Sequence, residues 1–128
     1  MTGRVVHFEL PYEDGDRARA FYRDAFGWNT MVIPELDYTG VTTGPTGEDG
    51  TGKEPGFING GMFARGEQEP RGPVLVIDVP DLDAALARVE ELGATVVTPT
   101  ITVGDMGFAA YFRDPEGSVV GVWQTAGA

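Results

Sequence analysis

The chain has 128 residues, of which 41% are hydrophobic and 10% aromatic, which is enough for one domain with a buried core. Its formal net charge is −11, from 20 acidic and 9 basic residues, so most of its surface would repel a nucleic-acid backbone. The absence of cysteine excludes disulfides, thiolate nucleophiles and cysteine metal ligands.

Membrane and secretion signals are also missing from the sequence. No stretch approaches the roughly 20 consecutive apolar residues that a membrane-spanning helix needs. The N-terminus enters Arg4-Val5-Val6-His7 without a basic segment followed by a long apolar core, so no secretion signal is predicted. We therefore expect a cytoplasmic protein that binds neither membranes nor nucleic acid.

Residues 4–10 are predicted to form the first strand, ending at Pro11 because proline has no backbone donor for a sheet. Alternation places His7 and Glu9 on one face of this strand. The opposite, apolar face carries Val6, Phe8 and Leu10.

A helix is predicted next, with Asp14 or Asp16 as its N-terminal cap and Gly27 at its C-terminal end. The spacing of its apolar residues indicates a stripe that packs against the sheet. We expect this buried stripe to contain Ala18, Phe21, Tyr22, Ala25 and Phe26.

Three further segments complete the first half. Residues 28–33 and 38–43 are predicted strands joined by a turn at Pro34-Glu35, and residues 57–64 return to strand. Between them, residues 44–56 contain five glycines, two prolines and four charged residues. This composition predicts a surface loop and the most mobile internal segment of the chain.

The second half repeats the pattern. Residues 74–79 are a predicted strand, and Asp81 is expected to cap a helix that stops at Gly93. The predicted buried stripe of this helix is Leu82, Ala85, Leu86, Val89 and Leu92. Strands are then expected over residues 95–103 (interrupted by Pro99), 107–113 and 118–124, the last two flanking a turn at residues 114–117.

The sequence thus predicts an α+β protein with two tandem βαβββ modules, approximately residues 1–66 and 72–126 of a single domain. In each module the helix can cover only one face of its sheet. The uncovered faces of two curved mixed sheets would line a concave groove suited to a small ligand.

The chain resembles the vicinal oxygen chelate superfamily, which includes glyoxalase I, extradiol dioxygenases and bleomycin-resistance proteins. The resembling segments are residues 7–11 (HFELP), 20–28 (AFYRDAFGW), 59–62 (NGGM), 81–93 and 112–117 (FRDPEG). The resemblance implies a glyoxalase-like fold and a homodimer. In the enzymes of this superfamily, it also implies a divalent metal held by four histidine or glutamate side chains from four strands.

Only one of these four ligand positions carries a suitable side chain. His7 matches the first ligand, whereas the second belongs within residues 59–63, which offer glycine, methionine and phenylalanine. The third falls on Val74 or Val76 and the fourth on Gly121. A lone imidazole does not hold zinc, nickel or iron against water, so we expect no bound metal and no cofactor.

A metal-free small-molecule-binding protein is therefore the first interpretation, with sequestration of a hydrophobic or aromatic molecule as in the bleomycin-resistance branch. His7 and Glu9 would supply polar recognition, and aromatic and apolar side chains would supply contact area. The expected ligand-binding residues are His7, Glu9, Asn59, Met62, Phe108 and Trp123. No catalytic residue is assigned.

Three alternatives remain open at the level of sequence. The first is a glyoxalase-like metal-dependent lyase, isomerase or dioxygenase, with zinc, nickel or iron held by His7 and other ligands. The second is an isomerase or epimerase that works without metal, in which His7 beside Glu9 acts as a general base. The third is an accessory or structural subunit without a ligand.

Overall fold

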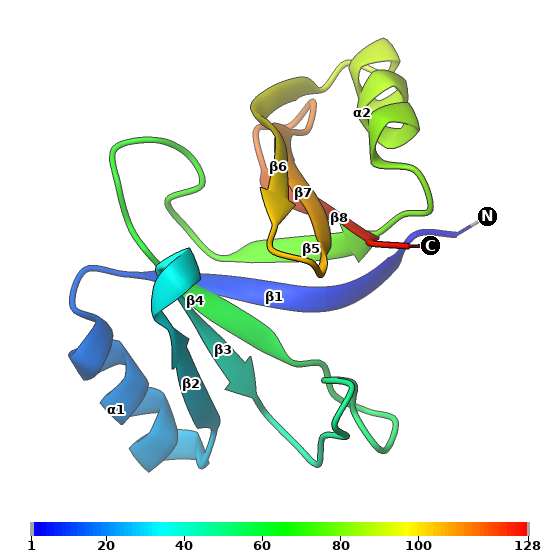
Figure 1. Ribbon diagram of the computed structural model, residues 1–128. Helices are drawn as coiled ribbons and strands as arrows, with labels where there is room; N and C mark the ends of the chain where they lie inside the picture. Colours follow the sequence, from blue (N-terminus) through cyan, green and yellow to red (C-terminus); the bar gives the residue numbers. More distant parts are fainter. Residues whose placement is uncertain (1, 128) are drawn as a thin grey trace. The chain divides into compact units, whose positions relative to one another are not determined.

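A computed structural model describes residues 2–127, which form two units with four strands and one α-helix each. Residues 7–73 make up the first unit, and the remaining described residues make up the second. Each half follows the order strand, helix, strand, strand, strand (Figure 1). The predicted α+β class with two tandem βαβββ modules is confirmed.

The first unit contains mixed parallel and antiparallel strands. Its elements are the larger part of β1 (Arg4–Tyr12), α1 (Gly15–Phe26), β2 (Asn29–Ile33), a short 3-10 helix (Pro34–Leu36), β3 (Tyr38–Thr42) and β4 (Gly60–Ala64). The strand order is β2-β3-β4-β1, so the last strand of the unit inserts beside its first. β1 runs parallel to β4, while β2 with β3 and β3 with β4 are antiparallel.

The first strand continues past Pro11, so the predicted end at this proline is wrong. Pro11 lies opposite Phe63 and Tyr12 opposite Ala64 in the pairing of β1 with β4. Proline removes a donor but keeps its carbonyl, and the Tyr12 carbonyl still accepts a hydrogen bond from the Arg65 amide at 2.8 Å. The parallel pairing therefore extends to the beginning of α1.

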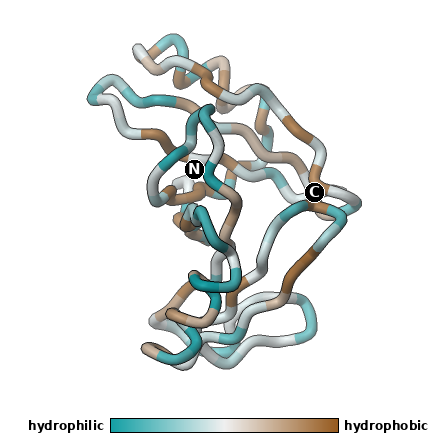
Figure 2. The backbone as a smooth tube through the Cα atoms, turned by 90° about the vertical axis from the view of Figure 1, so that its left-hand side faces the viewer, coloured by the Kyte–Doolittle hydropathy of each residue, from teal (hydrophilic) through white to brown (hydrophobic). Residues whose placement is uncertain are grey.

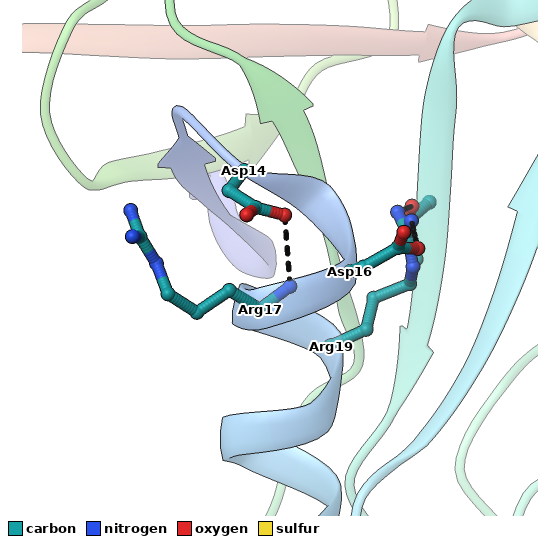
Figure 3. Close-up of polar contacts among 5 residues, drawn as sticks. Asp14, Asp16, Arg17 and Arg19 are labelled. Carbon is teal, nitrogen blue, oxygen red and sulfur yellow. Dashed lines mark hydrogen bonds and ion pairs between the residues drawn. The ribbon is translucent and has the colours of Figure 1, made fainter.

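Both predicted ends of α1 are confirmed. The Asp14 carboxylate accepts a hydrogen bond from the backbone amide of Arg17, which satisfies one of the free donors of the first turn (Figure 3). Gly27 ends the helix in the left-handed region, with φ of 73°, where a side chain would be strained. Asp16 has a different role, since it holds Arg19 at 2.8 Å.

The predicted buried stripe of α1 is wrong, because none of the helix residues is buried. Phe21 is 57% exposed and Phe26 66% exposed. Their rings instead join a cluster at the helix end in which Tyr22 stacks on Trp28, with centroids 4.7 Å apart. Apolar periodicity specified the helix, but no second layer covers its apolar face within the unit.

The second unit has the same internal order. Its elements are β5 (Val74–Asp78), α2 (Leu82–Glu91), β6 (Thr95–Val103), β7 (Gly107–Arg113) and β8 (Val119–Thr125), with strand order β5-β8-β7-β6. β5 is parallel to β8, and the other pairs are antiparallel. The pairing of β6 with β7 shifts register on both sides of Thr98, so the predicted interruption near Pro99 is present.

α2 covers one face of these strands and creates the unit's core. Asp81 caps the helix as predicted, and the core consists of Leu82, Ala110, Phe112 and Val122. Ile77, Leu86, Val89 and Phe108 pack around this cluster. Leu92 does not take part and is 61% exposed, because α2 ends one residue earlier.

No helix within residues 2–127 is long and apolar enough to cross a membrane. Hydropathy changes over short distances along the backbone, as the alternating colours of Figure 2 show. This alternation is typical of strands and helices with one packed and one hydrated face.

Candidate functional site

A hydrogen-bonded network in the first unit joins the only histidine of the chain to a buried carboxylate. His7 Nε2 lies 2.8 Å from the Tyr38 hydroxyl oxygen. The same hydroxyl donates to Glu9 Oε2 over 2.7 Å. Glu9 is 6% exposed, whereas His7 and Tyr38 are half-buried, so the network joins a buried carboxylate to two partly exposed side chains.

The backbone places these three side chains together through strand register. His7 and Glu9 alternate onto one face of β1, and Glu9 lies opposite Gly61 on β4. Tyr38 starts β3 and pairs with Phe63, two residues beyond Gly61 and therefore on the same face. A Cβ atom on Gly61 would collide with the Tyr38 hydroxyl and ring, so only glycine lets the phenol lie across β4 to Glu9.

Burial lowers the pKa of His7 below its ordinary value, because desolvation disfavours the imidazolium; the negative charge of Glu9 opposes this effect without cancelling it. The neutral imidazole is therefore the form that the folded protein favours near neutral pH.

We expect the free energy of unfolding to fall as the pH is lowered below about 6.5, the ordinary histidine value. In this range the unfolded chain binds a proton at His7 that the folded chain, with its lower pKa, resists. The contribution of neutral His7 to stability is complete above the pKa that His7 has in the unfolded chain. It disappears as the pH falls through the pKa that His7 has in the folded chain. Urea unfolding at several pH values measures it. His7→Gln should remove this component of the pH dependence, and an identical slope in the variant would contradict the assignment.

Asn59, a predicted ligand-binding residue, is engaged in holding the loop of residues 44–56. Its Oδ1 accepts a hydrogen bond from the Thr43 amide at 2.9 Å. Its Nδ2 donates to Thr46 Oγ1 at 3.0 Å and to the Gly50 carbonyl at 3.4 Å. The loop is thus tied to the start of β4, and the mobility predicted from its composition stays a prediction.

Met62 lies on the opposite face from His7 and Glu9. It pairs with Leu10 on β1 and Thr39 on β3, next to the Glu9–Gly61 pair, so alternation turns it away from the network. It is 1% exposed. The structure therefore uses Met62 as a core residue of the first unit.

Phe108 and Trp123 belong to the second unit and lie on opposite faces of its strands. Phe108 packs against the core beneath α2. Trp123 lies opposite Ala109 and shares a face with Gly121, away from this core. Of the six residues predicted to bind ligand, the structure joins His7 and Glu9 in one network and gives Asn59, Met62 and Phe108 other contacts.

The residues present do not fit a metal ion of the type that the resemblance implies. No group of three or more histidine, cysteine, aspartate or glutamate side chains within residues 2–127 could hold one. The third and fourth ligand positions, Val76 and Gly121, lie opposite each other in the pairing of β5 with β8. A Cβ atom on Gly121 would lie 3.2 Å from both the Tyr111 ring and a Val76 methyl group, so apolar groups occupy that place.

Sequence reasoning did not include Tyr38 among the expected ligand-binding residues. The available signal was the Gly60-Gly61 pair, since glycine inside a strand often marks the close approach of another group. It also missed an open surface depression of about 440 Å³ at the start of α1, lined in part by Tyr12, Arg17 and Phe21. Arg17 and Phe21 are four residues apart and share one helix face.

Comparisons with known proteins point to one family. The family described as "Bleomycin resistance protein-like N-terminal" matches residues 4–44. CFP32 of Mycobacterium bovis, provisionally named a glyoxylase, is 30% identical over 124 residues, which cover 91% of this chain. The chain spans only 43% of that relative's length. A glyoxylase-like domain-containing protein of Didymella fabae is 29% identical, with 92% of this chain and 91% of the relative covered.

Solved structures share the fold at low sequence identity. A glyoxalase/bleomycin resistance protein/dioxygenase superfamily member from Vibrio splendidus superposes with a TM-score of 0.63 at 19% identity, covering 96% of this chain and 99% of the other. Methylmalonyl-CoA epimerase from Mycobacterium tuberculosis gives a TM-score of 0.61 at 18% identity, covering 94% and 87%.

Proposed function

We propose that the chain is a member of the vicinal oxygen chelate superfamily that binds a small hydrophobic or aromatic molecule without a metal ion. The observation that supports this proposal is the contact between His7 and Tyr38. His7 is the one side chain that matches the superfamily's ligand positions, and its Nε2 is hydrogen-bonded to a phenol.

Strand β4, where the superfamily places its second metal ligand, supports the same proposal. Tyr38 covers Gly61 on β4, so the space where a side chain from this strand would project is filled by a phenol. A stable divalent site needs about three to four protein ligands with fixed geometry. His7 and Glu9 are the two side chains of the network that commonly ligate divalent metals, and the Tyr38 hydroxyl is hydrogen-bonded to both of them.

Sequestration is the activity that we propose for this binding site. The network supplies polar recognition, and the partly exposed rings of His7 and Tyr38 offer contact surface for a flat ligand. No serine, threonine or cysteine nucleophile contacts His7 within the described residues, so the proposal includes no covalent step.

Metal analysis and thermal shift together test the proposal. Protein purified without chelator should contain no stoichiometric zinc, nickel or iron, and added chelator should leave its melting temperature unchanged. An aromatic ligand should raise the melting temperature in proportion to ln(1 + [L]/Kd). If the purified protein contains stoichiometric metal and the His7→Gln variant does not, the result would contradict the proposal and favour a metal-dependent lyase, isomerase or dioxygenase. A Tyr12→Phe variant controls for loss of a hydroxyl outside the network.

We also propose that the protein is a homodimer. The apolar side chains of α1 and β2 support this, since Phe26 is 66% exposed and Met31 69% exposed. Exposed apolar groups of this size are commonly covered by a protein partner. Sedimentation equilibrium should give twice the monomer mass of 13.7 kDa, and Phe26→Ser should shift the population towards monomer. A monomer at all concentrations up to about 100 µM would contradict this proposal.

A further inference from the structure

The placement of hydrogens among His7, Tyr38 and Glu9 follows from the two hydrogen bonds that join these side chains. The Tyr38 phenol has one hydrogen and donates it to Glu9 Oε2. The hydroxyl oxygen must therefore act as the acceptor at its other contact, which makes His7 Nε2 the donor. A neutral imidazole carries a single N–H, and in His7 this group is Nε2–H.

His7 Nδ1 is consequently a lone-pair acceptor. It makes no hydrogen bond to any residue that the structure describes. The His7 side chain is half-buried, so part of it is exposed. A ligand that reaches Nδ1 meets an acceptor and must itself supply the hydrogen.

The other two side chains reinforce this requirement. A carboxylate only accepts hydrogen bonds, and the Tyr38 hydroxyl has already given its hydrogen to Glu9. The Glu9 charge is 6% exposed and thus poorly screened by water, and the chain's net charge of −11 has the same sign. An anionic ligand would add both another acceptor and another negative charge.

We propose that this network recognises an aromatic hydrogen-bond donor, namely a phenol, catechol or aryl amine, and discriminates against aryl carboxylates. His7 Nδ1 accepts the ligand hydrogen, and Tyr38 is a positioning residue that fixes the His7 tautomer. This inference rests on the proposed function, because it names the ligand class of the same site.

Nitrogen-15 NMR of histidine-labelled protein tests the tautomer directly, because the chain contains one histidine. The Nδ1 signal should have the shift of an unprotonated nitrogen and Nε2 that of a protonated one. Tyr38→Phe should lose this fixed state and show a mixture of the two tautomers, whereas the Tyr12→Phe control should keep it. A native protein with hydrogen on Nδ1 would overturn the inference before any ligand is added.

A matched naphthalene series tests the ligand class by fluorescence titration. 2-Naphthol and 2-aminonaphthalene donate a hydrogen bond, 2-methoxynaphthalene only accepts one, and 2-naphthoate is an anion. The donors should bind about tenfold more tightly than the ether, which corresponds to one hydrogen bond, and more tightly still than the anion. Donor binding should also move the Nδ1 signal. Comparison of the affinities of 2-naphthol and 2-aminonaphthalene then shows whether the site prefers a phenol or an aryl amine.

The outcomes separate this inference from the function on which it rests. If all four compounds bind equally, or if 2-naphthoate binds best, aromatic binding stands and the donor requirement is overturned. If none of them binds or changes the melting temperature, both are overturned. In Tyr38→Phe the preference for 2-naphthol over the ether should shrink, while Tyr12→Phe should retain it.

Discussion

Gly61→Ala is expected to destabilise the protein by about 1–3 kcal/mol and to weaken binding of a phenolic ligand at least about tenfold. The added methyl group would occupy the place of the Tyr38 hydroxyl and ring, so the phenol must rotate away from β4. This breaks the contacts of Tyr38 with both His7 and Glu9. A carboxylate that is 6% exposed then loses one of its donors. Urea unfolding and titration with 2-naphthol measure the two effects.

A second glycine and a double variant provide the controls. A Cβ atom on Gly66 meets nothing within 4 Å, so Gly66→Ala should leave stability and binding nearly unchanged. In a Tyr38→Ala background the obstacle is gone, and Gly61→Ala should add little further destabilisation. Strictly additive effects of Gly61→Ala and Tyr38→Ala would show that the two residues do not act through one contact.

Local signals predicted the order of elements and most of their ends. Asp14 and Asp81 both cap helices because their carboxylates accept from the amide three residues later, a contact that depends on a few neighbouring residues alone. Gly27 similarly ends α1 because a left-handed residue is required there. Such features are readable because sequence neighbours determine them.

The exposure of α1 was not predictable in the same way. Its apolar spacing correctly indicates a helix with one apolar face, but burial also needs a surface that covers this face. Phe21 and Phe26 remain exposed because, within the first unit, their rings contact one another and Tyr22 rather than a second layer. Periodicity therefore identifies the face of a helix, whereas packing depends on tertiary arrangement.

In the candidate site, too, the sequence predicted the features that neighbouring residues determine and missed those that depend on tertiary arrangement. Strand alternation alone places His7 beside Glu9, and the structure retains this arrangement. Tyr38 is 29 residues from Glu9, and its role depends on the registers of two strand pairs that the sequence does not reveal. Met62 was predicted to share a site with Glu9, but it lies one residue after Gly61 on β4 and therefore on the opposite face of the strand. Without the register of β1 and β4, the sequence could not show this.

Leu82→Ala is expected to lower the free energy of unfolding by about 2–5 kcal/mol. Leu82 is 1% exposed at the first turn of α2 and packs with Phe112 and Val122 in the core of the second unit. Truncation removes its buried methyl groups and leaves a cavity that the surrounding strands close only in part. Its amide bonds the Gln124 side chain at 2.8 Å, a contact that alanine preserves, so the loss isolates side-chain packing.

The two tryptophans allow this effect to be assigned to one half of the protein, because Trp28 follows α1 whereas Trp123 lies on β8. In a Trp28→Phe background, fluorescence during urea unfolding should report the loss of stability around Trp123. Leu92→Ala is the matched control, since this leucine next to the end of α2 is 61% exposed and its truncation should cost about 0.5 kcal/mol or less. Equal effects of the two leucine substitutions would mean that α2 does not pack through Leu82. The core of the second unit would then have to be assigned to other side chains.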